Sequence, residues 1–198
     1  DLMATMHTHA EGWDVPPGVR LTDFSDPYFG DEDRLSRAFP ADSREADLVR
    51  WSLGRCQDAI LTAERDWPPV VVHGDLHGGN LKWHRDELAV FDFDDCGIAS
   101  PALDLAIATF YLRGSDPRVE AALRAGYAEV RPLPEPGQPV FEALVACRQL
   151  LLANDLLQSS TEHLRAQARG YLDRTVDRLA HWRQGGHFSL APTGATGG

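Results

Sequence analysis

The stretch from Val70 to Asp95 constrains the fold of this chain more than any other. It reads VVVHGDLHGGNLKW, then HRDE, then LAVFDFDD, so short apolar runs alternate with clusters of polar residues. The β-branched run Val70–Val72 follows two prolines, and it predicts a brief buried strand that delivers His73 and Asp75 to its end. Polar residues that follow a strand directly are candidates for a functional site.

Two further apolar runs, Leu81–Trp83 and Leu88–Phe91, predict a β-hairpin because a short polar connector joins them. The hairpin would bring Asn80, just before its first strand, close to Asp92, just after its second. We expect both to meet Asp75 at one end of a small three-stranded core. Three oxygen-bearing side chains without cysteine favour a hard cation such as Mg²⁺, which phosphate can share.

The spacing His73-x-Asp75-x-x-x-x-Asn80 is also that of the kinase catalytic loop, in which the aspartate receives a hydroxyl proton and the asparagine holds a metal. With Phe91-Asp92-Phe93-Asp94-Asp95 and Asp104-Leu105-Ala106 in order, the motif resembles the aminoglycoside phosphotransferase family. Relatives of that family include choline kinases, type II homoserine kinases and a bacterial stress-response protein kinase.

The resemblance implies ATP as co-substrate, Mg²⁺ as cofactor and a role for each polar residue. The implied roles are catalytic base for Asp75, metal and nucleotide binding for Asn80 and Asp92, and support of the loop for His73 and Asp104. Asp94 and Asp95 depart from the glycine that protein kinases carry after the phenylalanine. Their role stays open between a substrate ammonium contact, a further metal contact and a simple turn.

Two other interpretations of the motif compete with this one. Asp75 and Asn80 could serve only a turn, but a turn does not explain Asp92, which we expect to be buried between two phenylalanines. The run Gly74–Gly78 also resembles the first metal motif of calcineurin-like phosphatases. The further Gly-Asp and Asn-His pairs that those enzymes need after later strands are not found in the sequence.

Composition narrows the class of protein. The chain has 198 residues, of which 43% are hydrophobic and 25% charged, as in an ordinary globular domain with one core. Its net charge of -11 argues against nucleic acid or an anionic membrane as partner, and it suits a cationic substrate or simply an acidic solvated surface. Three widely spaced cysteines suggest neither disulfides nor a zinc site, which fits the cytoplasm. No apolar run approaches membrane-spanning length.

The predicted fold class is α+β, the helix-rich C-terminal lobe of a protein-kinase-like phosphotransferase with six or seven helices around a catalytic hairpin. The lobe is expected over residues 1–184, and residues 185–198 are expected to form a disordered tail. Helices are expected at the N-terminus, from Asp42 to about Arg65, from Pro101 to before Gly114, from Arg118 to Val130, and as an antiparallel pair after Pro139. His7 and His9 are expected to be surface or capping groups.

The predicted function is transfer of the γ-phosphate of ATP to a hydroxyl of a small, cationic molecule of the aminoglycoside or choline type. No glycine-rich phosphate loop is found, and Lys82 is the only lysine, so we expect the N-terminal nucleotide lobe to be absent and the isolated chain to be inactive. Two alternatives remain open. One is a Ser/Thr protein kinase of the stress-response type, and the other is a non-enzymatic pseudo-kinase binding module.

Overall fold

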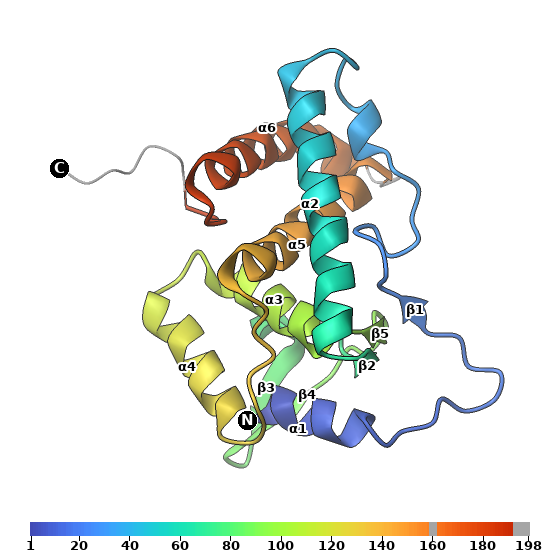
Figure 1. The fold of residues 1–198 in the computed structure, drawn as a ribbon, viewed down its shortest axis with the longest axis vertical. Coiled ribbons are helices and arrows are strands. Elements are labelled where there is room, and N and C mark those ends of the chain that lie inside the picture. Colours follow the sequence, from blue (N-terminus) through green and yellow to red (C-terminus); the bar gives the residue numbers. More distant parts are fainter. Residues whose placement is uncertain (159–161, 192–198) are drawn as a thin grey trace.

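A computed structural model of the chain describes residues 1–158 and 162–191, and these form a mixed α+β structure, as expected (Figure 1). Its helices are α1 (Leu2–Ala10), η1 (Leu35–Arg37), α2 (Arg44–Asp66), η2 (Gly78–Asn80), α3 (Pro101–Leu112), α4 (Pro117–Ala128), α5 (Gln138–Gln158) and α6 (Glu162–Gly185), where η marks a 3-10 turn. Its strands are β1 (Thr22–Asp23), β2 (Val70–Val72), β3 (Leu81–His84), β4 (Glu87–Val90) and β5 (Gly97–Ala99).

Helix α5 lies at the centre of the helical core, where α2, α3 and α6 pack against it (Figure 1). Nearly every side chain from Phe141 to Leu151 is buried. Helices α5 and α6 run antiparallel, because Gln149 bonds to Thr175 while the earlier Glu142 accepts from the later Phe188. No helix among the described residues is long and apolar enough to cross a membrane.

The helix boundaries follow local capping chemistry. The Ser43 hydroxyl accepts the backbone N–H of Ala46 at 3.1 Å and starts α2, and Ser100 followed by Pro101 starts α3. Both helix starts agree with the sequence prediction. Helix α2 extends to Asp66 and packs against α5, α6 and α3 (Figure 1).

The sheet differs from the expected three-stranded core. Strand β2 pairs antiparallel with β5, with Val71 opposite Ile98, and β5 pairs parallel with β1. The hairpin β3–β4 forms a separate two-stranded sheet. The expectation was wrong because β5 is only three residues long and starts at Gly97, where a Cβ atom would lie 2.4 Å from the Thr22 carbonyl oxygen. Unlike the equally short β2, which is three valines, β5 reads Gly-Ile-Ala and has a single β-branched residue by which to recognise a strand.

The hairpin itself matches the prediction. Its strands pair from Leu81 opposite Val90 to His84 opposite Glu87. The two turn residues, Arg85 and Asp86, both have positive φ, 48° and 66°, as a two-residue hairpin turn requires.

The segment after α6 packs on the core as far as it is described. Phe188 is fully buried, and its N–H donates to the Glu142 carboxylate at 2.8 Å. The buried Arg113 guanidinium joins that carboxylate and the Phe188 carbonyl oxygen. Residues 187–191 are therefore not the start of a disordered tail, and residues 192–198 lie outside the described part of the chain.

Replacing Phe188 with Ala should lower the free energy of unfolding by about 3 to 5 kcal/mol, because a buried ring leaves a cavity in a packed core. The change is measured by urea denaturation. Trp83→Ala is the matched control, since Trp83 is 71% exposed and its loss should leave stability nearly unchanged. Equal stability of Phe188→Ala and the parent would show that this segment does not pack as described.

Candidate active site

The loop between β2 and η2 carries the predicted catalytic residues, and Gly74 fixes its position. Gly74 has φ +78°, and a Cβ atom there would lie 2.6 Å from the Asp95 carbonyl oxygen and 2.8 Å from the Phe24 ring. Only glycine fits so close an approach with that backbone conformation. The Gly74 N–H donates to Asp104 Oδ1 at 2.9 Å, which ties the loop to the first turn of α3.

Asp104 is fully buried and holds three elements together. Besides Gly74, its Oδ2 lies 2.9 Å from Nε2 of His7 in α1, whose Nδ1 lies 2.8 Å from the Tyr127 hydroxyl in α4. Burial alone would raise the pKa of Asp104, but the hydrogen bond and charge of His7 and the Gly74 N–H lower it below its ordinary value. His7 is thus a buried partner of Asp104, and its expected role as a surface or capping group was wrong.

His73 connects the loop to the segment that follows the hairpin. Its Nε2 donates to the Phe91 carbonyl oxygen at 3.1 Å, while its Nδ1 accepts the Asp75 N–H at 3.3 Å. The buried ring also lies against the ring of Phe93, with centroids 4.9 Å apart. Its contacts hold Asp75 and the neighbourhood of Asp92 in a fixed relation.

One oxygen of the Asp75 carboxylate, Oδ1, is held by two donors. Its Oδ1 accepts the Tyr111 hydroxyl of α3 at 3.0 Å and pairs with the guanidinium of Arg148 in α5. Arg148 also donates to the Tyr111 hydroxyl at 2.7 Å. Burial raises the pKa of Tyr111 to about 12, so the phenol remains a donor at neutral pH.

The second oxygen of Asp75 is held more loosely. Asn80 Nδ2 lies 3.4 Å from Oδ2, and His77 Nε2 lies 3.5 Å from it. With Oδ1 occupied by two donors, Oδ2 is the oxygen that can accept a proton from a ligand. Tyr111, Arg148 and His77 had not been predicted as site residues. Arg148 carried a usable signal, because it is a charged residue inside the apolar run of α5.

Asn80 and Asp92 are brought together by the hairpin, as the spacing predicts. The Phe91 N–H donates to the Asn80 carbonyl oxygen at 3.2 Å, and Asp92 follows with φ 66°. Asn80 is buried and its Nδ2 donates to the Asp75 carbonyl oxygen at 3.0 Å, which leaves its amide oxygen for a cation. Asp92 is exposed between half-exposed phenylalanines, so its expected burial was wrong.

These donors fit a hard divalent cation as a partial site. Carboxylate and amide oxygens are the ligands that Mg²⁺ prefers, and Mg²⁺ keeps several waters or phosphate oxygens in its shell. Across residues 1–158 and 162–191, no cluster of three or more His, Cys, Asp or Glu side chains forms a complete metal site. Asn80 and Asp92 could therefore hold the cation only together with oxygens from a ligand and water.

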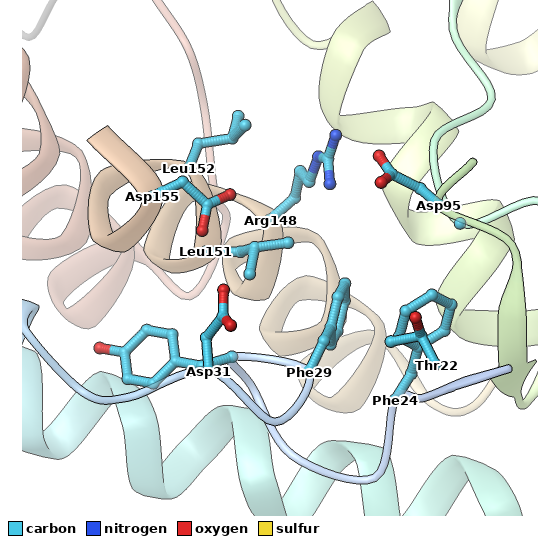
Figure 2. Close-up of a pocket in the computed structure, with 11 residues that line it drawn as sticks. Thr22, Phe24, Phe29, Asp31, Asp95, Arg148, Leu151, Leu152 and Asp155 are labelled. Atoms are coloured by element: carbon cyan, nitrogen blue, oxygen red, sulfur yellow. The ribbon is translucent and has the colours of Figure 1, made fainter. Parts of the chain in front are cut away.

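A cavity of about 380 Å³ lies beside Asp75 and its partner Arg148, on the side of α5 (Figure 2). Gly74 and Arg148, the neighbour and the partner of Asp75, both line it. The other lining residues are Thr22, Phe24, Tyr28, Phe29, Asp31, Asp95, Leu151, Leu152 and Asp155. In Figure 2 the Asp95 carboxylate points toward Arg148. Asp94 is exposed and does not line this cavity.

Comparison with known proteins identifies similar folds. The model of the phosphotransferase enzyme family matches residues 2–140. The structure of a microcompartment-associated aminopropanol kinase aligns with a TM-score of 0.72 and 21% identity, over 96% of this chain and 62% of that one. The amicoumacin kinase hAmiN, solved with AMP-PNP, Ca²⁺ and Ami, aligns with a TM-score of 0.57 and 17% identity, over 88% and 56%. No curated protein matches.

Both aligned structures share the protein-kinase-like phosphotransferase fold with this chain. The alignment with the aminopropanol kinase extends over almost the whole chain, so helices α1 to α6 belong to one common architecture. The chain spans less than two thirds of the length of either structure, 62% of one and 56% of the other.

Replacing Asp104 with Asn should lower the free energy of unfolding by about 1.5 to 3 kcal/mol at neutral pH, because it removes buried charge-assisted hydrogen bonds. The pKa of Asp104 is lower in the folded state than its ordinary value of 3.8. Its contribution is therefore present above pH 3.8 and is lost as the pH falls through the lowered pKa.

Urea denaturation of parent and Asp104→Asn over a range of pH measures this dependence. The stability difference between them should shrink in acid, whereas Asp86→Asn at the exposed hairpin turn should match the parent throughout. A difference that does not change with pH would mean that the charge of Asp104 contributes nothing to the fold.

Proposed function

Because this chain belongs to the phosphotransferase enzyme family, we propose that it transfers the γ-phosphate of ATP to a hydroxyl group of a small molecule. One observation carries the proposal. The carboxylate of Asp75 is held by Tyr111 and Arg148 directly beside a cavity that can take a ligand. A fixed carboxylate next to an acceptor cavity is what a positioned general base requires.

In this proposal Asp75 orients the acceptor hydroxyl and takes its proton through Oδ2 as the oxygen attacks the γ-phosphorus atom. The bond from that phosphorus to the β,γ-bridging oxygen breaks, and ADP leaves with the bonding electrons. Phosphoryl transfer needs little covalent help from the protein, so alignment and charge stabilisation provide most of the rate. Tyr111 and Arg148 keep Oδ1 in place, and the loop cannot shift because Gly74 is bonded to Asp104.

Asn80 and Asp92 would hold the divalent cation, and Asn80 also links it to Asp75 through the hydrogen bond to the Asp75 carbonyl oxygen. When bound, Mg²⁺ would neutralise charge on the phosphate oxygens during transfer. The exposure of Asp92 suits this role, because a ligand that brings its own phosphate oxygens must reach the cation from outside the lobe.

We further propose that the residues that bind the triphosphate of ATP lie outside these 198 residues. The sequence contains no glycine-rich phosphate loop, and Lys82, its only lysine, is exposed on the first strand of the hairpin. The lobe would then supply the base, the cation ligands and the acceptor site, while donor alignment depends on a further segment.

The cavity favours a small acceptor over a protein substrate. At about 380 Å³ it lies near the lower end of the range of about 300 to 1,000 Å³ that is usual for small-molecule sites. Peptide substrates need an extended groove or sheet edge instead. The hydrogen bonds that hold Gly74, Asn80 and Asp75 support an enzyme over a binding module that has lost its chemistry.

Transfer of radiolabel from ATP tests the proposed reaction. The chain alone should give near-background transfer, because well-aligned reactants can account for about 7 to 11 kcal/mol of the barrier and alignment of the donor is missing. The chain extended by the upstream segment of its reading frame should transfer phosphate, and Asp75→Asn should abolish that transfer. Asp86→Asn, at the exposed turn, is the matched control and should retain it.

Two results would contradict this proposal in different ways. Robust, Asp75-dependent transfer by the 198-residue chain would mean that the lobe itself grips ATP. Transfer by the extended chain that survives Asp75→Asn would remove Asp75 as the base.

Calorimetric titration with Mn²⁺ in the presence of ATP tests the cation site. Asn80→Ala and Asp92→Ala should each weaken cation binding by about tenfold or more, since even residues behind the ligands of a metal matter to that extent. Asp86→Ala removes a carboxylate from the opposite end of the hairpin and should leave binding unchanged. If all three variants bind Mn²⁺ like the parent, Asn80 and Asp92 are not its ligands.

A further inference from the structure

His77 belongs to the loop that carries Asp75, and its imidazole has one nitrogen that the fold uses and one that it does not. The Nδ1 atom accepts the backbone N–H of Gly79 at 2.9 Å. A backbone amide nitrogen can only donate, so Nδ1 carries no proton. The ring proton of His77 is therefore on Nε2, which makes Nε2–H a hydrogen-bond donor.

Two contacts fix the direction in which this donor points. The ring of His77 lies against the ring of Tyr111 in α3, with centroids 4.6 Å apart and an interplanar angle of 40°. It also lies so close to Gly79 that a Cβ atom there would be 2.5 Å from Cε1 and 2.9 Å from Nδ1 of the imidazole. Rotation of the ring would break the bond from the Gly79 N–H, so Nε2–H keeps one orientation.

The Nε2–H group has no hydrogen-bond acceptor among the residues that the structure describes. The carboxylate oxygen that it faces, Asp75 Oδ2, lies 3.5 Å away, beyond the usual range of about 2.7 to 3.2 Å for an N–H···O bond. The side chain of His77 is 28% exposed. A ligand that enters from outside the lobe can therefore reach this donor.

A role for His77 as an anchor of Asp75 does not fit this geometry. Tyr111 and Arg148 already hold Oδ1 of the carboxylate. The other oxygen, Oδ2, takes the acceptor proton in the proposed reaction, and an N–H bonded to it would compete with the acceptor hydroxyl for that oxygen. The donor of His77 is thus better suited to a group other than Asp75.

The place of the donor coincides with the place of the proposed reaction. Nδ2 of Asn80 and Nε2 of His77 approach Asp75 Oδ2 at 3.4 and 3.5 Å. A hydroxyl that gives its proton to Oδ2 lies within about 2.6 to 3.2 Å of it, and the phosphorus atom that the hydroxyl attacks lies next to the hydroxyl. The oxygens of the transferred phosphoryl group therefore come within reach of Nε2–H.

The charge of the lobe makes such a donor valuable. The chain has a net charge of -11, and Arg148, the cation beside Asp75, is already paired with that carboxylate. Lys82 lies exposed on β3. Phosphoryl oxygens carry negative charge that must be stabilised during transfer. His77 offers them a donor that the fold holds in place and does not use itself.

We propose that His77 is a further catalytic residue, whose Nε2–H donates a hydrogen bond to a non-bridging oxygen of the phosphoryl group during transfer. The inference rests on the proposed function and deepens it. As the acceptor oxygen bonds to phosphorus, the bond to the β,γ-bridging oxygen breaks and ADP takes its electron pair. The acceptor proton passes to Asp75 Oδ2, and His77 keeps its own. A donor fixed in advance stabilises the charge that develops on these oxygens.

NMR of the chain with ¹⁵N-labelled histidine tests the donor directly. The imidazole signals of His77 should show the proton on Nε2 and an unprotonated Nδ1. Titration with 5-hydroxypentyl phosphate and Mg²⁺, which places a phosphate where the transferred group would lie, should shift the Nε2–H signal to saturation. The alcohol 1,5-pentanediol lacks the phosphate and should leave that signal nearly unchanged.

Four substitutions separate the donor from the ring that carries it. His77→Phe keeps a ring beside Tyr111 but removes the donor, and it should weaken binding of 5-hydroxypentyl phosphate by about tenfold or more, as loss of a hydrogen bond to a charged group predicts. His77→Gln keeps an N–H group and should lose less. Gly79→Ala displaces the imidazole and should also weaken binding. Gly78→Ala is the matched control, because a Cβ atom there meets no atom within 4 Å.

Affinities of the variants are measured from the backbone amide signals of the loop, and melting temperatures show that each variant is folded. In the extended chain, His77→Phe should lower kcat by about tenfold or more and leave the KM of the acceptor nearly unchanged. A proton on Nδ1, no binding of 5-hydroxypentyl phosphate, or parent-like binding by His77→Phe would each overturn the inference.

The titration involves no phosphate transfer, so its failure can be told from failure of the proposed function. Phosphate binding that depends on His77, without transfer that depends on Asp75, would contradict the proposed function and leave His77 as a phosphate donor. Transfer that depends on Asp75 but has the same kcat in His77→Phe would remove His77 alone.

Discussion

The buried carboxylate of Asp104 is the contact on which the geometry of the candidate active site depends. It accepts the Gly74 N–H with one oxygen and pairs with His7 through the other, so the catalytic loop, α1 and the start of α3 meet at one residue. A buried charge without hydrogen-bond partners is energetically costly. Movement of any of these elements would expose the Asp104 carboxylate to solvent or break one of its hydrogen bonds, so it is disfavoured. The position of the loop is therefore set by the helices rather than by the loop itself.

Helix α5 then links the loop that carries Asp75 to the cavity in which we propose that the acceptor binds. Arg148 reaches from α5 to the Asp75 carboxylate, and Asp155 on the same helix lines the cavity beyond it. The apolar side of α5 is packed against α2, α3 and α6, which fixes both side chains through a rigid support. Arg148, which holds the Asp75 carboxylate, and Asp155 in the cavity wall are thus parts of one helix, so their separation is fixed.

The sequence predicted those parts of the site that depend on local spacing. The hairpin and the approach of Asn80 to the residues around Asp92 follow from strand length and turn chemistry, so they were predictable. The bond from Asp104 to the loop was implied by the family resemblance. The partners Arg148 of Asp75 and His7 of Asp104 were not predicted, because they lie 73 and 97 positions away. Contacts so distant depend on how helices pack, which the pattern of a single sequence does not encode.

A crystal structure of the chain with 1,5-pentanediol bound tests the central claim most directly, because it shows where an acceptor hydroxyl lies relative to Asp75. We predict that a hydroxyl oxygen lies within hydrogen-bond reach of the Asp75 carboxylate, about 2.6 to 3.2 Å, and that the rest of the molecule lies in the cavity beside α5. A hydroxyl directed away from Asp75, or a ligand bound outside this cavity, would contradict it.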